Sequence, residues 1–235
     1  MSYSVVCSYA VKFNCFRHFM THYFRTCMGT LMGTLAMLLL HGLVFANPDP
    51  TPAAKKLLVV GDSLSAAYGL PRSSGWVALL AEQIKREAPS YAVVNASISG
   101  ETLSGAWARL PALLKLHAPA VVVIELGGND ALRGLSLNQT RAALGSMVDA
   151  AKKSGARVLI LPMKMPPNFG AAYATGFENI YPTVAKQYGA ALAPFLMQDF
   201  AANPDFYQRD RIHPTTAAQP LMLKAVWPSL KPLLK

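Results

Sequence analysis

The chain has 235 residues, of which 52% are hydrophobic and 14% are charged, so it can bury the core of one domain and is not a disordered chain. The formal net charge is +10, but the basic residues are scattered, which favours a solvated surface over a nucleic-acid site. All three cysteines, Cys7, Cys15 and Cys27, lie near the start, so the remaining chain can have no disulfide, thiolate metal site or cysteine nucleophile.

The N-terminal part has the composition of a secretory signal. Residues 1–27 contain Lys12, Arg17 and Arg25 but no acidic residue, and residues 28–45 are almost all apolar or small. We expect residues 1–46 to be a cleaved signal peptide, residues 47–55 a linker, and residues 56–235 one periplasmic or secreted domain. Because the apolar run approaches the minimum length of a membrane span, an uncleaved anchor is the alternative. After cleavage we expect no stable membrane anchor.

Strand-like and helix-like segments alternate along the rest of the chain. Apolar runs typical of buried strands lie at residues 57–60, 92–96, 120–126, 157–163 and, more weakly, 190–195. Ser136 and Gln139 form a capping-box pattern at the start of one helix. Pro111 is expected to begin a helix, and Pro182 to kink a helix over residues 177–188. Five apolar runs separated by helical crossovers predict a parallel sheet covered on both faces, in a three-layer α/β/α domain.

The first apolar run ends in Gly61-Asp62-Ser63, which places a hydroxyl at the carboxyl end of a strand. Open parallel sheets bind their ligands at this edge. Glycine, aspartate and serine are also ordinary turn residues, so this run alone leaves a catalytic serine and a capping turn equally open. Two further loops rich in glycine and asparagine follow the second and third runs, at Asn95 and at Asn129.

A base for the Ser63 hydroxyl has few candidates. Three of the five histidines precede the expected cleavage site, which leaves His117 and His213. His117 ends a helical pattern just before a buried strand, at the edge opposite Ser63, and is therefore a poor catalyst. His213 follows Asp210 by three residues in a polar loop, where the carboxylate can accept the Nδ1 hydrogen and leave Nε2 for a hydroxyl. Together these residues predict a serine hydrolase.

Four blocks of the chain, in this order, resemble the SGNH, or GDSL, hydrolase family. They are Gly61-Asp62-Ser63, Asn95 with Ser99-Gly100, Gly127-Gly128-Asn129-Asp130 and Asp210-x-x-His213. The residues around these blocks are most similar to one branch, that of periplasmic arylesterases and multifunctional acyl-CoA thioesterase I, protease I and lysophospholipase enzymes. The resemblance extends from about residue 56 to the final helix.

The resemblance implies a flavodoxin-like fold with strand order 2-1-3-4-5, and no metal or other cofactor. It implies that Ser63 is the nucleophile, His213 its general base and Asp210 the residue that orients the base. The oxyanion hole would consist of the N–H groups of Ser63 and Gly100 and the Asn129 side chain. A loop of six residues, Asp130, Ala131, Leu132, Arg133, Gly134 and Leu135, is similar to a mobile loop that helps to receive acyl chains. Arg211 departs from close relatives, which tend to have a small residue there. It can alter the rim of the site or place a cation near the leaving group.

We therefore expect an exported, monomeric serine hydrolase that cleaves carboxylic esters and acyl thioesters of small molecules through an acyl-Ser63 intermediate. The chain has no G-x-S-x-G sequence, which excludes the α/β-hydrolase arrangement. One alternative is a carbohydrate O-acetyl esterase, because such enzymes share the four blocks. Another is a flavodoxin-like module that binds phosphate or flavin at residues 61–65, although this leaves Asp210 and His213 unexplained.

Overall fold

Five parallel strands form one sheet at the centre of the domain. The computed structural model describes residues 53–165 and 167–235, so the expected signal peptide lies outside the described residues. The strands are β1 (Lys55–Gly61), β2 (Tyr91–Asn95), β3 (Val121–Glu125), β4 (Arg157–Ile160) and β5 (Ala191–Leu192). Their order in the sheet is β2-β1-β3-β4-β5. The expected five-stranded parallel α/β architecture and its strand order are confirmed.

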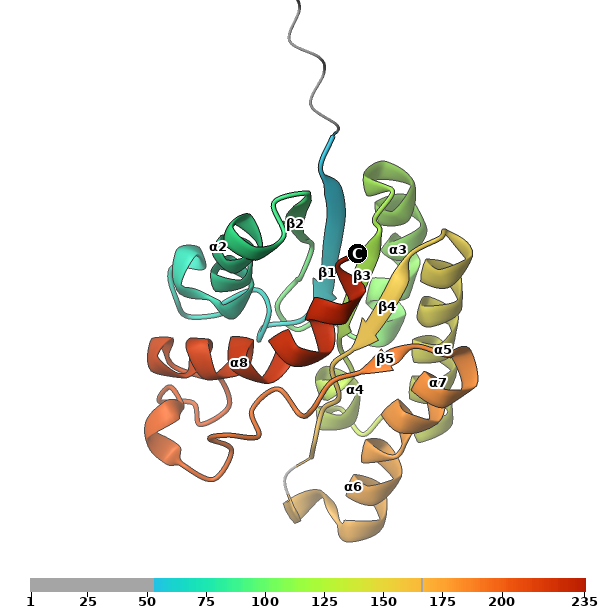
Figure 1. The fold of residues 1–235 in the computed structure, drawn as a ribbon. Helices are drawn as coiled ribbons and strands as arrows, with labels where there is room; N and C mark the ends of the chain where they lie inside the picture. Colours follow the sequence, from blue (N-terminus) through green and yellow to red (C-terminus); the bar gives the residue numbers. More distant parts are fainter. Residues whose placement is uncertain (1–52, 166) are drawn as a thin grey trace, which may run out of the picture. The chain divides into compact units, whose positions relative to one another are not determined.

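Helices cover both faces of this sheet (Figure 1). On one face lie α2 (Trp76–Glu87) and α8 (Gln219–Leu230), and on the other lie α3 (Leu103–His117), α5 (Leu137–Lys153) and α7 (Ile180–Tyr188). Two shorter helices, α4 (Gly128–Leu132) and α6 (Ala171–Glu178), follow β3 and β4. In the described part of the chain, no helix combines the length and apolar character needed to cross a bilayer.

The two central strands lie in the middle of the core. Residues 57–60 of β1 and 121–124 of β3 are completely buried, because helices cover both faces of the sheet. Pairing of β1 with β3 places Gly61 opposite Glu125. Since all five strands are parallel, their carboxyl ends meet at one edge, where the loops that follow β1, β3 and β4 gather.

Several element boundaries differ from the sequence expectations. Strand β1 begins at Lys55, within the expected linker, and β4 ends at Ile160 rather than at residue 163. Pro111 lies inside α3 instead of beginning a helix. The Pro111 side chain is exposed, whereas Leu110 and Leu114 of the same helix are buried. Burial of this apolar face of α3 outweighs the cost of the hydrogen bond that proline cannot donate.

Two expectations about helix ends also change. The Ser136 side chain makes no capping hydrogen bond, so the capping box is wrong, although the Ser136 carbonyl accepts a bond from the Thr140 hydroxyl at 3.0 Å. The helix containing Pro182 is not merely kinked but divided at Asn179, between α6 and α7. A proline clashes with the carbonyl four residues earlier, so the break lies where Pro182 would place it.

Gly127 provides a test of the packing behind the sheet edge. Its φ is +109°, and an added Cβ would lie 2.5 Å from the Tyr181 hydroxyl oxygen, which donates to the Leu126 carbonyl at 3.0 Å. Gly127→Ala should lower the free energy of unfolding by about 2–4 kcal/mol, through backbone strain and overpacking together. Gly134 also has a positive φ but open space around it, so Gly134→Ala should cost only about 1 kcal/mol. Equal losses in urea unfolding would contradict this account.

Candidate active site

Three side chains from two loops that are distant in sequence form one chain of hydrogen bonds. Ser63 follows β1, and its hydroxyl oxygen lies 2.9 Å from Nε2 of His213. The other ring nitrogen, Nδ1, lies 2.7 Å from Oδ2 of Asp210. A carboxylate accepts but does not donate, so Nδ1 carries the hydrogen and Nε2 is left to accept from the serine hydroxyl.

The loop residues 210–213 are shaped by the Asp210 carboxylate itself. Its Oδ1 accepts the backbone N–H groups of Ile212 at 2.9 Å and of His213 at 3.0 Å. Desolvation tends to raise the pKa of Asp210, but the backbone and ring hydrogen bonds of His213 and the Ile212 N–H outweigh it and lower the pKa to about 2. The carboxylate therefore stays ionised beside the histidine throughout the neutral range.

Contacts with neighbouring loops hold the His213 ring in place. Tyr207 and Pro214 form an antiparallel bridge, and the Gln208 N–H donates to the His213 carbonyl at 2.7 Å. The Gln208 side-chain amide donates to the Tyr68 carbonyl at 2.8 Å and to the Pro214 carbonyl at 3.0 Å. The Tyr68 ring packs on the imidazole, with ring centroids 4.4 Å apart. These contacts join the histidine loop to the loop that follows Ser63.

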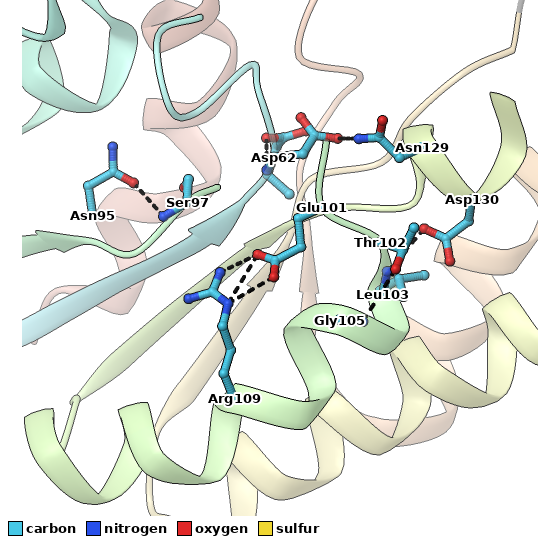
Figure 2. A network of polar contacts seen from close by, with 11 residues as sticks. Asp62, Asn95, Ser97, Glu101, Thr102, Leu103, Gly105, Arg109, Asn129 and Asp130 are labelled. Atoms are coloured by element: carbon cyan, nitrogen blue, oxygen red, sulfur yellow. Dashed lines mark hydrogen bonds and ion pairs between the residues drawn. The ribbon is translucent and has the colours of Figure 1, made fainter. Parts of the chain in front are cut away.

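Asp62 connects the serine loop to Asn129 (Figure 2). Its Oδ2 accepts a bond from the Asn129 amide at 3.1 Å, and its Oδ1 accepts the Leu64 N–H at 3.1 Å. Only 3% of Asp62 is exposed, and this burial raises its pKa to about 6, against the lowering effects of the Leu64 N–H, the charge on His213 and the Asn129 amide. A primary amide has two hydrogens, so Asn129 keeps a second one for another acceptor.

A second carboxyl group lies beneath this loop. Glu125 ends β3 and is completely buried, and its Oε2 accepts from the Ser65 hydroxyl at 2.7 Å and from the Asp62 N–H at 3.4 Å. Burial raises the pKa of Glu125 well above its usual value, and the neighbouring Asp62 charge adds to this. A Cβ at residue 61 would lie 2.8 Å from Glu125 Oε2, so only glycine allows this close approach.

A cavity of about 730 Å³ opens beside the serine hydroxyl. Polar groups line one part of it and include Ser63, His213, Asp62 and Asn129, whereas most of the wall is apolar. The apolar or mainly apolar lining residues are Leu64, Leu132, Met163, Met165, Phe195, Met197, Ala201, Ala202, Pro204, Tyr207 and Ile212. Such a cavity can accept an apolar chain while its reactive end meets the hydroxyl.

The structure distributes the other predicted site residues differently. Of the loop 130–135, only Leu132 lines the cavity. The buried Asp130 carboxylate accepts the Leu103 N–H at 3.0 Å at the start of α3 (Figure 2), and Arg133 donates to the Gly100 carbonyl at 3.0 Å. Gly100 has a φ of +79° and is not among the lining residues. The expected roles of Gly100 and of this loop stay predictions.

The sequence patterns do not identify several residues that build or line the site, among them Asp62, Glu125, Tyr68 and Lys164. Asp62 lies within the first recognised block, but its spacing gives no sign that it orients Asn129. Glu125 lies just before the third block, and its spacing gives no sign that it is buried beneath the serine loop. Tyr68 and Lys164 have no motif of their own and reach the site only through the fold. Within residues 53–165 and 167–235, no cluster of three or more His, Cys, Asp or Glu side chains could hold a metal ion.

The chain is similar to known esterases and thioesterases in sequence and in fold. The model of the GDSL-like lipase/acylhydrolase family matches residues 59–220. The chain is 50% identical to the esterase TesA of Pseudomonas aeruginosa over 87% of this chain and 98% of that protein. It is 42% identical to thioesterase 1/protease 1/lysophospholipase L1 of Escherichia coli K12, over 77% of this chain and 86% of that protein. A crystal structure of the psychrotrophic esterase EstA of Pseudoalteromonas sp., inhibited by monoethylphosphonate, has 38% identity and a TM-score of 0.73 over 77% of this chain and 98% of that one.

The raised pKa of Asp62 predicts a particular pH dependence of stability. An aspartate protonated up to about pH 6 when folded, but only to about pH 3.8 when unfolded, stabilises the fold below pH 3.8 and loses that contribution as pH rises through 6. The free energy of unfolding of the wild type should therefore fall by on the order of 2 kcal/mol between these pH values. In the Asp62→Asn variant this fall should be absent. Urea unfolding across this range measures it. Parallel curves for wild type and variant would contradict the assignment, and Asp205→Asn, at an exposed aspartate, is the control.

Proposed function

Because the chain belongs to the GDSL-like lipase/acylhydrolase family, we propose that it hydrolyses carboxylic esters and acyl thioesters through an acyl-Ser63 intermediate. It is an enzyme of the esterase and thioesterase class. The observation that carries the proposal is the continuous hydrogen-bond chain from Ser63 through His213 to Asp210. The names of the relatives, an esterase and a thioesterase with lysophospholipase activity, support the same chemistry.

In the proposed reaction the Ser63 oxygen attacks the carbonyl carbon while Nε2 of His213 takes its proton. The imidazolium, stabilised by the ionised Asp210, then gives this proton to the departing alcohol or thiol, and an acyl-serine remains. Water next attacks the acyl carbon, His213 takes the proton of the water, and the acid leaves as Ser63 regains its hydrogen. Each half-reaction balances without a metal or organic cofactor.

During both acylation and deacylation, negative charge develops on the carbonyl oxygen, and hydrogen-bond donors must stabilise it. We assign these donors to the N–H groups of Ser63 and Gly100 and to the Asn129 side chain. The Asp62 carboxylate binds one Asn129 hydrogen and so fixes the plane of the amide. A donor held in place before the reaction stabilises the transition state more than a mobile one, because it needs no reorganisation.

The cavity favours an acyl chain as the bound part of the substrate. Its wall is largely apolar and has the volume of a small-molecule site. This favours acyl esters and thioesters over the alternative of an acetylated carbohydrate, whose hydroxyl groups would leave water for an apolar surface. The proton-transfer chain also has no purpose in a phosphate- or flavin-binding module. The substrate segment 130–135 would act through Leu132, which lines this wall.

The cellular setting follows from the N-terminal composition. A leader over residues 1–46 would deliver the enzyme to the periplasm or the medium, where it would work as a monomer on small acyl substrates. Nucleic acid has no part in this proposal.

Replacement of the nucleophile is the first test. Ser63→Ala should lower the turnover rate of p-nitrophenyl esters at least about a thousandfold, because no other group in the proposed mechanism can form the acyl intermediate. The melting temperature should change little, since the variant removes one half-buried hydroxyl. A variant that keeps full activity would refute the mechanism.

Asn129 gives a second, more specific test. If its amide stabilises the oxyanion, Asn129→Ala should lower kcat about a hundredfold or more and change KM little. Asn138→Ala, an exposed asparagine on α5, serves as the matched control. Steady-state kinetics on one ester separate the two constants, and an effect confined to KM would remove Asn129 from the oxyanion role.

A further inference from the structure

Tyr68 contacts both ends of the serine–histidine pair. Its backbone N–H donates to the Ser63 carbonyl at 3.1 Å. Its carbonyl accepts the side-chain amide of Gln208, in the loop that contains His213, at 2.8 Å. Its ring packs on the His213 imidazole, with ring centroids 4.4 Å apart and an angle of 38° between the ring planes. The tyrosine therefore connects the nucleophile to its base through the main chain and through the ring.

The backbone just before Tyr68 is strained. Ala67 has a φ of +59°, in the left-handed region, which is unfavourable for a residue with a Cβ. The bond from the Tyr68 N–H to Ser63, and a bond from the Leu70 N–H to the Ala67 carbonyl at 3.0 Å, hold this turn. Strained backbone beside a reactive group is a candidate for a functional role. Here the turn brings an aromatic ring against the imidazole.

The Tyr68 side chain belongs neither to the core nor to the cavity wall. It is 51% exposed, and it is not among the residues that line the cavity, although His213 is. The ring therefore contacts the imidazole without lining the space that the substrate would occupy. Burial of apolar surface explains little of its position, because half of the residue remains in water.

The imidazole acquires a positive charge in the proposed mechanism. His213 takes a proton from Ser63 and later from water, so an imidazolium forms in both half-reactions. A cation within about 6 Å of the centroid of an aromatic ring is attracted by the negative face of that ring. The two rings lie within this distance, and their planes are closer to stacked than to perpendicular. The tyrosine ring thus favours the charged form of the base over the neutral form.

We propose that Tyr68 is a positioning residue whose ring holds the His213 imidazole beside Ser63 and stabilises the imidazolium that forms in each proton transfer. The inference rests on the proposed hydrolysis and adds a residue to it. Simple packing would support the neutral and the charged imidazole equally, whereas the face of an aromatic ring favours only the charged one.

Other charged groups near this imidazole stay constant in the test. Asp210 binds Nδ1, and the charge on Asp62 also attracts an imidazolium. Lys164 and Arg211 line the same cavity as His213. A substitution of Tyr68 alters none of these four groups, so a difference between two variants at this position reports the ring.

Tyr68→Leu and Tyr68→Phe separate the ring from the main chain. Both variants keep the backbone bonds, but only phenylalanine keeps the aromatic face. On one p-nitrophenyl ester at alkaline pH, Tyr68→Leu should lower kcat about twofold to fivefold and change KM little, because the ring contacts the base and not the cavity. Tyr68→Phe should keep the kcat of the wild type.

The pH profile of kcat/KM separates stabilisation of the charge from a structural defect. Protonation of the free base removes activity at low pH. A ring that stabilises the imidazolium favours both this inactive form and the transition state. Tyr68→Leu should therefore lower the alkaline plateau and also move the acidic limb about 0.3–0.7 pH units to lower pH, so that its curve meets that of the wild type at acid pH. A structural defect would lower kcat/KM by the same factor at every pH.

An NMR titration of the His213 ring measures the same effect without turnover. In Tyr68→Leu the ring should titrate about 0.3–0.7 pH units lower than in Tyr68→Phe, with both proteins shown to be folded by urea unfolding. Leu116→Ala is the control, because Leu116 is 74% exposed near the end of α3, and it should change neither the titration nor the pH profile.

Parallel pH profiles and equal His213 titrations for Tyr68→Leu and Tyr68→Phe would overturn the role of the ring. Failure of the hydrolase proposal would look different. In that case the wild type would turn over no ester or thioester, while the NMR titration would still show whether the ring favours the imidazolium.

Discussion

The hydrogen bond between the His213 ring and the Ser63 hydroxyl joins two loops that are 150 residues apart. One loop is rigidly placed, because it continues a strand whose residues 57–60 are completely buried. The other has almost no core of its own and depends on polar contacts, namely the Gln208 amide, the Tyr207–Pro214 bridge and the turn around the Asp210 carboxylate. Each of these contacts is individually modest. The proton-transfer chain therefore relies on several weak constraints acting together on one short loop, and that loop is the part of the site most easily displaced.

Acidic groups beneath the serine loop carry an electrostatic cost. Asp62 and Glu125 are both buried, and burial raises the pKa of each. Buried ionisable groups of this kind destabilise a fold unless hydrogen bonds satisfy them. Here those bonds have a geometric effect: Glu125 holds Ser65 and the Asp62 N–H, while Asp62 holds Leu64 and Asn129. Stability is thus lost in exchange for a fixed orientation of the loop and of the amide that faces the cavity.

The sequence allowed the central sheet to be predicted because burial there depends on composition alone. Residues 57–60 and 121–124 are apolar on both faces, and any parallel sheet covered by helices requires that pattern. Local patterns failed where tertiary packing decides the outcome. Pro111 lies within α3 because its apolar neighbours are buried, and Ser136 matches a capping pattern without making the bond. The contact of Asp62 with Asn129 links the loop after β1 to α4, which follows β3. No spacing along one chain specifies which of several polar residues will meet at the ends of two strands.

The site divides between the centre of the sheet and its edge. The residues proposed to do the chemistry at the sheet, Ser63 and Asn129, follow the long central strands β1 and β3, whereas Met163, Lys164 and Phe195 follow β4 and β5. Strand β5 has only two residues, with pairing limited to Leu159–Ala191 and Ile160–Leu192. Short ladders and exposed loops open more readily than a buried core. The wall that we propose contacts the acyl chain is therefore the more adaptable part of the site. Substrate preference can change there while the groups around Ser63 keep their geometry.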